Sequence, residues 1–597
     1  MPRTLDIRTM QEPDSLATAI SEKATAWENA RMKWYMNAKE TLENLYATST
    51  RDIYNQTREF DNSTHIPKLT QIRDMLVTFY IDAIFSLPDY VEWEPYSEKT
   101  VSVNSKNIIK SLVRQMLKDS DFKPTARQLI EDYVDHGNAF VTAVPVTFQL
   151  MSASNMSTLY TGPKAMRINP LDILFDPFAV SFERTPKIIR SVKTLGELIK
   201  EADELPEDAQ VYKDAVKKAL DKRRTIRNTI GAMSSGDAIK DDICNIAGCG
   251  SWSQYYNTDT VELLTFYGDL YDIEKDKMYH DARIVIMDRT DVLLNEGIPN
   301  HGFGCNIFKA GWRDRKDNLW SMSPLDNIKG MQFMIDFLEN KRADIFNYIS
   351  NPMFKVKGDA EMPEDFYPGC TIGLDNDSDI QSLAPDATVL QADLYIDRYL
   401  TMMEEMAGTP REAMGFRSPG EKTAFEVSQL NTASSRLFND KTRKFEEELL
   451  EPLITLMLRI YLSDKSRVTR IRETTPEGAT LFKDVNVADL SAEGKLIAVG
   501  SSTYTEKARM AQTIQQIYNT GIASDPLVFN NFDPDIIATS IAYCTGLDKF
   551  KGILRPNARS DAELQMAKTQ EINRQMLEET QVRGMMDAQQ AVIQGSR

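Results

Sequence analysis

The spacing of hydrophobic residues divides the chain into a helical beginning, a β-rich middle and a second helical part. Apolar side chains recur every three or four residues over 15–48, and again up to Phe85, which predicts two long helices. Two shorter helices are expected after them, at 104–118 and 124–136. We interpret the two long helices as elements that pack into a core.

Beyond His136 the pattern changes to short β-rich runs separated by Pro, Gly and Asn. The predicted strands lie within AFVTAVPVTFQL, MRINPLDILFDP, IIRSVK and TVELLTFYGDLYDI, and DARIVIMDRTDVLLNE is expected to form a hairpin. Residues 205–255 carry a basic KRRTIRNT segment followed by Gly and Ser, which predicts an irregular insertion. We favour an exposed surface loop there, with a dedicated binding patch as the alternative.

Helical periodicity returns after Pro324, with an apolar stripe formed by Ile328, Met331, Ile335, Leu338 and Ile345. A helix that is apolar over so wide an arc needs partners on more than one side. Burial within one chain and packing against a neighbouring subunit both meet that need. The following residues, 351–390, are acidic and rich in turns and predict a small β-containing module, after which 391–407 returns to helix.

A loop rich in Gly, Pro and Arg then interrupts the helical pattern, with the sequence TPREAMGFRSPGEKTAF at 409–425. The residues expected to permit turns and mobility are Gly408, Pro410, Gly415, Pro419 and Gly420. The basic residues are Arg411, Arg417 and Lys422, which would suit brief contacts with phosphate groups. Salt bridges within or between subunits are the alternative role for these cations.

A long helix is expected to follow the loop and to continue to about residue 463. Pro452 lies inside it, removes one helical hydrogen bond and predicts a kink about one turn earlier. Two returning strands, RVTRIRE and KLIAVG, come next. Residues 503–597 are predicted to be mostly helical and end in a Gln- and Met-rich segment with few apolar anchors.

Composition and charge then narrow the class of protein. The 597 residues carry a formal net charge of −18, so tight binding to nucleic acid is not favoured, because that affinity comes from neutralising phosphates. No apolar run reaches the length of a membrane span, and the first residues do not resemble a signal peptide, so a cytoplasmic site of synthesis is expected. Five cysteines are too few for a disulfide framework in a chain of this length.

Motifs of catalysis are absent from the sequence. It contains no GxxxxGK[ST] phosphate loop, no GxSxG and no HExxH. Cys244 and Cys249 lack the further ligands of a zinc site, and the four histidines show no metal-binding spacing. The acidic GDLYDIEKD is better explained as the rim of a hairpin than as a metal site. We therefore expect no catalytic residues, no metal and no cofactor.

The order of these parts resembles a phage portal protein of the type found in short-tailed phages. GWRDRKDNLWSMSPLDNIKGMQ, at 311–332, looks like the beginning of the first stem helix of such portals. GTPREAMGFRSPGEKTAFEVSQL, at 408–430, resembles their tunnel segment, while RINPLDILFDP and VELLTFYGDLYD are similar to wing strands. The resemblance covers about residues 15–500 and does not extend to the 205–255 insertion.

The resemblance implies an α+β fold with eight successive parts. These are a wing (1–318), a first stem helix (319–350), a clip (351–390), a second stem helix (391–407), a tunnel loop (408–424), a long kinked helix (425–463), returning wing strands (464–502) and a helical crown (503–597) that forms a barrel or a disordered tail. In this scheme the 325–349 stripe packs subunits together.

The resemblance also implies a ring of about twelve copies at one vertex of a capsid, with double-stranded DNA passing through its channel. The implied partners are the terminase motor, a tail adaptor, the major capsid protein and scaffolding proteins, and the implied location is the virion. An acidic channel wall would repel phosphates and let DNA slide. Two other functions remain open from the sequence: a head–tail scaffold or adaptor without a channel, and a metal-dependent packaging nuclease.

Overall fold

The structure is a computed structural model of mixed helix and strand, which agrees with the expected α+β class. It describes residues 4–7, 13–53, 62–85, 91–95, 103–152, 155–204, 210–226, 260–297, 305–350, 353–357, 380–383, 392–408, 438–463, 468–474, 480–486 and 494–498. The chain divides into two compact units, Met1–Glu473 with Phe482–Ser501 and Thr474–Leu481 with Ser502–Arg597. Nearly all of the described residues belong to the first unit.

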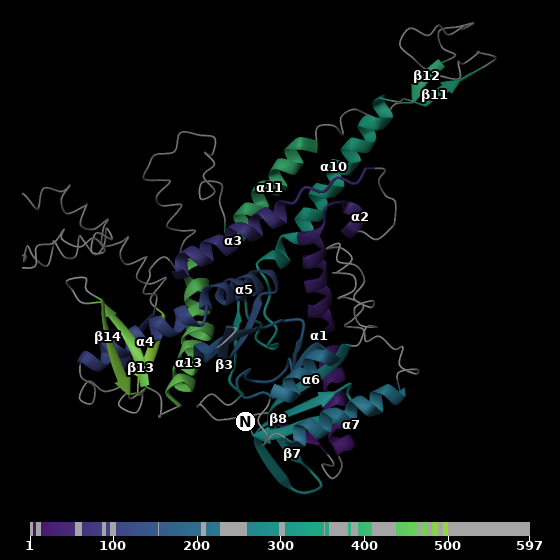
Figure 1. The fold of residues 1–597 in the computed structure, drawn as a ribbon. Coiled ribbons are helices and arrows are strands. Elements are labelled where there is room, and N and C mark those ends of the chain that lie inside the picture. The colour runs from purple at the N-terminus through teal and green to yellow at the C-terminus, as the bar shows by residue number, and fades with distance from the viewer. Residues whose placement is uncertain are drawn as a thin grey trace, which may run out of the picture. The chain divides into compact units, whose positions relative to one another are not determined.

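The helices predicted in the first part of the chain are all present (Figure 1). Their bounds are α1 Pro13–Tyr46, α2 Thr50–Ile53, α3 Lys68–Phe85, α4 Val103–Asp119 and α5 Phe122–Asp135. α5 ends at His136, and Gly137 then takes a φ of 67°. A Cβ atom on Gly137 would lie 2.4 Å from the carbonyl carbon of Met322, so only glycine fits this turn.

The largest sheet has six strands, in the order β5-β6-β7-β8-β9 with β1 added to β7 in parallel. The hairpin predicted from DARIVIMDRTDVLLNE is the antiparallel pair β8 and β9. Apolar residues of α1 pack on one set of sheet side chains, and those of two later helices pack on another. The strand bounds are β1 Leu5–Ile7, β5 Ile173–Phe175, β6 Lys187–Thr194, β7 Thr260–Asp272, β8 Lys277–Met287 and β9 Asp291–Gly297.

The prediction of an irregular insertion at 205–255 is wrong for its first part. α7 runs through Gln210–Ile226, after α6 at Leu195–Glu204. Val216 and Ala219 are buried against Val261 and neighbouring strand residues, so apolar spacing at three residues fixes this helix despite its basic composition. Residues 227–259 lie outside the described part of the chain.

A second, three-stranded antiparallel sheet has the order β10-β3-β4, formed by Ile307–Gly311, Asn138–Ser152 and Asn155–Ile168. Residues of this sheet contribute to the largest apolar core, together with residues of α3, α4 and α5 and of the helical parts after residue 325. Trp320 lies in a neighbouring aromatic cluster and stacks on Trp34, with ring centroids 3.9 Å apart.

The later part of the first unit begins with a short 3-10 turn, Leu325–Asn327, that leads into α10. Figure 1 shows α10 ending at a two-stranded hairpin from which α11 returns alongside it. The remaining helical bounds are α10 Lys329–Ser350, α11 Asp393–Ala407, a π-helical turn at Glu446–Leu450 and α13 Glu451–Ser463. The strands are β2 Val91–Pro95, β11 Met353–Val356, β12 Ile380–Leu383, β13 Val468–Thr474, β14 Thr480–Asn486 and β15 Gly494–Ala498.

The returning strands are β13 and β15, as the sequence indicated, and β15 pairs antiparallel with β2. Strand β2 itself has no counterpart among the predictions. Its Trp93 is 1% exposed and pairs with Leu496, and a Cβ on Gly494, which pairs with Pro95, would lie 2.5 Å from the Trp93 indole. The pair therefore brings two segments some 400 residues apart in the chain into one ladder, which local sequence pattern does not reveal.

Candidate functional site

The predicted DNA-contacting loop lies outside the described residues. This applies to Arg411, Arg417 and Lys422 and to the turn residues Pro410, Gly415, Pro419 and Gly420. Only its first residue, Gly408, is described: it ends α11 with a φ of 73°, and its N–H donates to the carbonyl of Glu405. A left-handed glycine is the usual way to end a helix and redirect the chain.

The apolar stripe of α10 packs largely inside the chain. Ile328 and Ile335 are 0% exposed in the main core, and Met331 and Leu338 are half-buried against it. Ile328 and Ile335 are thus enclosed by their own chain, and the predicted role of the stripe in subunit packing stays a prediction. Ile345 is half-buried.

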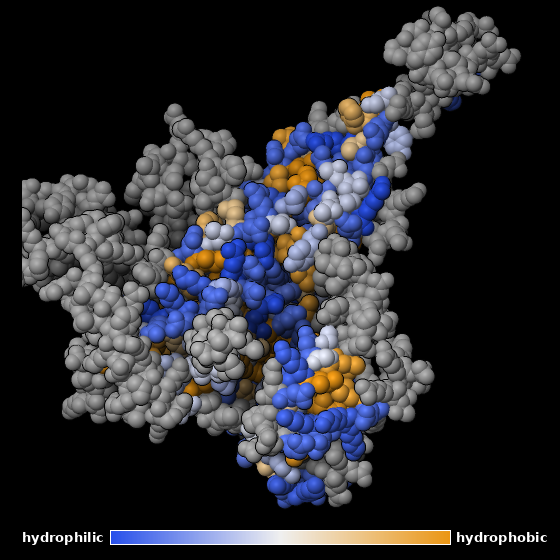
Figure 2. Space-filling model, in the orientation of Figure 1, coloured by the Kyte–Doolittle hydropathy of each residue, from blue (hydrophilic) through white to orange (hydrophobic). Residues whose placement is uncertain are grey.

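On α10 and α11 a different set of apolar side chains faces outward. In Figure 2, apolar patches interrupt the polar surface in the region of α10 and α11. The exposed members are Phe333, Phe346 and Tyr348 on α10 and Leu394, Tyr395 and Met406 on α11. Large apolar side chains are thus exposed on both helices, and a contiguous patch of such residues would suit contact with another protein.

The buried face of α10 carries polar residues at intervals of four: Gln332, Asp336, Asn340 and Asp344. They bind the segment Asn62–Leu69, which we call the strap. Asn340 accepts from the Thr64 N–H and donates to the Thr64 carbonyl, both at 2.8 Å. Asp336 accepts from the Ile66 N–H at 3.0 Å, and its other oxygen lies 2.8 Å from His65 Nδ1.

The two ends of this interaction are equally well defined. Gln332 accepts from the Leu69 N–H at 3.1 Å and donates to the Ile66 carbonyl at 2.5 Å. Asp344 accepts from the backbone and side-chain N–H groups of Asn62 at 3.1 and 2.8 Å. These groups satisfy backbone donors and acceptors of the strap that pair with no strand of the described sheets.

The four polar residues were missed because the helix was predicted from its apolar positions alone. The signal was present in the sequence, since Gln332, Asp336, Asn340 and Asp344 repeat at i, i+4, i+8 and i+12 and must share one helix face. A polar stripe of that kind is usually solvated, and only the folded chain places the strap over it.

α10 and α11 are also joined directly. The guanidinium of Arg342 pairs with Glu339 at 2.7 Å and with Asp393 at the beginning of α11. Lys68, at the end of the strap, donates to Glu404 of α11 at 2.6 Å, and both side chains are nearly buried. The strap thus touches both helices of the pair.

The helix after the loop is interrupted near the predicted place. A π-helical turn occupies Glu446–Leu450, and Pro452 is the second residue of α13. π turns and prolines are both common causes of bends, and the kink predicted from Pro452 stays a prediction. Two ion pairs at i,i+4 lie on this helix: Arg443 with Glu447 at 2.7 Å and Lys444 with Glu448 at 3.7 Å.

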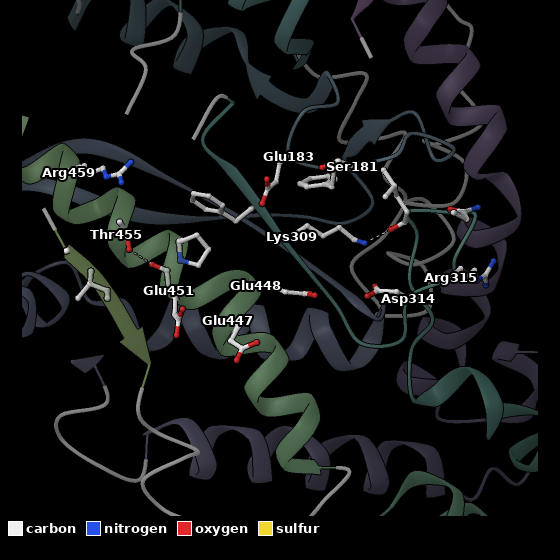
Figure 3. Close-up of a pocket in the computed structure, with 17 residues that line it drawn as sticks. Ser181, Glu183, Lys309, Asp314, Arg315, Glu447, Glu448, Glu451, Thr455 and Arg459 are labelled. Atoms are coloured by element: carbon white, nitrogen blue, oxygen red, sulfur yellow. Dashed lines mark hydrogen bonds between the residues drawn. The ribbon is translucent and has the colours of Figure 1, made fainter. Parts of the chain in front are cut away.

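A cavity of about 730 Å³ lies beside this turn (Figure 3). In Figure 3, Glu448 from the helix and Asp314 from the loop after β10 point toward each other, with Lys309 of β10 beside them. Glu448 accepts from the Gly311 N–H at 3.2 Å, and Asp314 accepts from Ser321 and Lys444. The cavity is lined by both signs of charge, so it has no single preference for anions or cations.

Burial controls protonation in this cavity. It lowers the pKa of Lys309 to about 8, against the opposing effect of the Asp314 and Glu448 carboxylates. It also raises the pKa of Glu448, which Lys444 partly offsets. Burial would raise the pKa of Asp314 as well, but hydrogen bonds from Lys444 and Ser321 bring it below its ordinary value. The network joins the π turn to the loop after β10.

The other predictions concern metals, cysteines and membrane spans. Within the described ranges, no three His, Cys, Asp or Glu side chains are grouped to hold a metal ion. Burial lowers the pKa of His136 to about 3, which leaves its imidazole neutral at ordinary pH. Cys244 and Cys249 are outside the described residues. No helix among those described combines the length and apolar character needed to cross a bilayer.

In comparisons with known proteins, neither a protein-family model nor a curated protein matches this chain.

Proposed function

We propose that the chain is a portal subunit: one copy of a ring at a capsid vertex, through which double-stranded DNA is packaged and ejected. In this proposal the protein is not an enzyme and needs no cofactor or metal. It acts as a conduit and as a docking platform for the terminase motor and the tail adaptor, and it contacts the major capsid and scaffolding proteins.

The observation that carries the proposal is the helix–hairpin–helix formed by α10, the β11–β12 pair and α11. The hairpin is antiparallel, with Met353 opposite Leu383, so the chain leaves along one helix and returns along the other. This is the arrangement expected of a stem with a clip at its end. Gly408 then redirects the chain toward the Gly- and Arg-rich loop and the helical residues 438–463.

Exposed apolar side chains and charge support the same proposal. A ring requires each subunit to present two different surfaces to its neighbours. Phe346 on α10 is 59% exposed and Leu394 on α11 is 77% exposed, so apolar surface is available on both helices. The net charge of −18 suits a channel that does not hold DNA tightly.

The test is native mass measurement and negative-stain imaging of the purified protein, alone and with scaffolding and capsid proteins. A closed ring of about twelve subunits with a central hole is expected from head-to-tail contacts that close by rotation. A monomer or dimer that persists when the capsid proteins are added would overturn the channel proposal and favour an adaptor.

A matched pair of variants makes the test specific to the two long helices. Phe346→Ser removes an exposed ring from α10, while Phe178→Ser removes an equally exposed ring, 62% accessible, from a loop elsewhere. Both should fold normally, because exposed positions tolerate substitution. Loss of rings with Phe346→Ser alone is expected. Equal ring formation by both variants would exclude this face of α10 from the subunit contact.

A further inference from the structure

The spacing of the polar residues along α10 matches the spacing of the strap groups that they bind. Four helical residues advance about 6.0 Å, and two residues of an extended chain advance about 6.6 Å. The polar residues of α10 recur every four positions, and the strap backbone groups that they bind belong to Asn62, Thr64 and Ile66, which are two positions apart. Because the spacings match, side chains on one face of α10 can bind every second residue of the strap without strand pairing.

Three of the four residues that bind the strap lie on the outer half of α10, and Gln332 lies before Ile335. Beyond Ile335 the buried side chains of this helix are Asp336, Asn340 and Asp344, all of them polar. The half before it includes Ile335 itself and follows Leu325 and Ile328, each 0% exposed in the main core. The inner half is therefore held by apolar burial together with Gln332, and the outer half is held by the strap, by α11 and by Leu338, which is half-buried against the main core.

The two kinds of attachment differ in how easily they open. Hydrogen bonds to the strap can be exchanged for bonds to water at a small net change in free energy. Apolar burial has no such replacement, because an exposed apolar side chain gains nothing from water. Lys68–Glu404, the contact of the strap with α11, is also polar and can be hydrated on opening. Detaching residues 62–65 of the strap thus moves no fully buried core residue, whereas Ile66 packs against the main core and Leu69 lies within it, so both stay in place.

We propose that the strap is a latch that fixes the outer halves of α10 and α11 to the body of the chain. Closed, it holds the outer half of α10 through Asp336, Asn340 and Asp344, and Arg342 joins that half to the beginning of α11. Lys68 also holds Glu404, on the inner half of α11. Open, it leaves the outer halves joined to each other by Arg342 and free to move as a pair, with Ile335 at the inner limit of the motion. This proposal concerns the isolated chain and does not rest on the proposed function.

The experiment is amide hydrogen exchange, followed by mass spectrometry, on the full-length protein and Asn340→Ala. The substitution removes both bonds to the Thr64 backbone. Exchange should become about tenfold faster or more in the strap and, with it, in 336–350 and 393–400. Exchange in α5, which the latch does not hold, should stay unchanged.

Two further variants keep the test decisive. Asn347→Ala makes the same replacement on the exposed side of the same helix and should leave exchange unchanged. Asn340→Asp keeps an acceptor for the Thr64 N–H but sets a second oxygen against the Thr64 carbonyl, so it too should speed exchange in the strap and in both outer halves. Faster exchange in the strap alone, with the outer halves of α10 and α11 unaffected, would overturn the latch, as would no increase anywhere.

Discussion

α13 and α10 are both anchored to the same core, but by opposite kinds of side chain. The buried positions of α13 are mostly apolar: Leu453, Ile454, Leu456, Met457, Leu458 and Tyr461. Those of α10 are Gln332, Asp336, Asn340 and Asp344, with Ile335 as the single apolar exception. One helix is held by the removal of apolar surface from water, the other by directed hydrogen bonds to one segment.

Apolar burial of α13 contributes stability, whereas the hydrogen bonds of α10 determine which segment packs on it and in which register. Apolar burial is non-directional, so α13 gains stability from any well-packed neighbour. The bonds of α10 form only if each residue meets its own partner, as Asn340 meets Thr64 and Asp344 meets Asn62. They add little net stability each but penalise every other register, because a shift would leave buried polar groups unpaired.

The largest effect is expected from breaking the apolar anchor. Leu453→Ala should lower the global free energy of unfolding by about 2–5 kcal/mol, because the fully buried side chain leaves a cavity in the core. Chemical denaturation of the two proteins measures this difference. A loss below about 1 kcal/mol would mean that the core around α13 collapses to fill the space.

A smaller effect is expected from making the polar face of α10 apolar. Gln332→Leu keeps the approximate size of a residue that is 0% exposed, but leaves the Leu69 N–H and the Ile66 carbonyl without their partner. We expect a loss of about 1–3 kcal/mol despite the added apolar surface. The control is Gln128→Leu on the exposed side of α5, which should be near neutral. If Gln332→Leu instead stabilised the protein, apolar burial would anchor α10 better than its hydrogen bonds do, and the contrast with α13 would not hold.

The smallest effect concerns Lys309, a half-buried cation beside the π turn. Its pKa is about 8 in the folded chain and about 10.5 when unfolded, so between these values the unfolded state binds more protons. Stability due to this group should therefore rise by about 1–2 kcal/mol as the pH increases from about 7 to about 9.5. Denaturation midpoints at the two pH values should show this rise, and Lys309→Met should reduce it.

The matched control for Lys309 is Lys316→Met, which replaces an exposed lysine of the neighbouring loop. This variant should keep the pH dependence of the parent protein. If Lys309→Met also keeps it, the ammonium of Lys309 is solvated in solution, and the cavity is more open than its packing indicates.

The elements with regular apolar spacing could be predicted from the sequence. This applies to α1, α3, α10 and α11 and to the β8–β9 hairpin, where the period of the pattern and the turn residues agree. α7 was missed because its basic composition was given more weight than the spacing of Val216 and Ala219. For the candidate site, the helices and Gly408 were predicted, whereas the loop cations fall outside the described residues.

The sequence by itself determined most of the segments that become helices and strands, with α7 and β2 as exceptions, since period and turn chemistry act over a few residues. The tertiary structure decided what each face meets. It buries Ile328 and Ile335 within the chain, pairs β2 with β15, and places the strap over the polar face of α10. Such pairings depend on segments hundreds of residues apart, and polar groups find their partners only when the whole core brings them together.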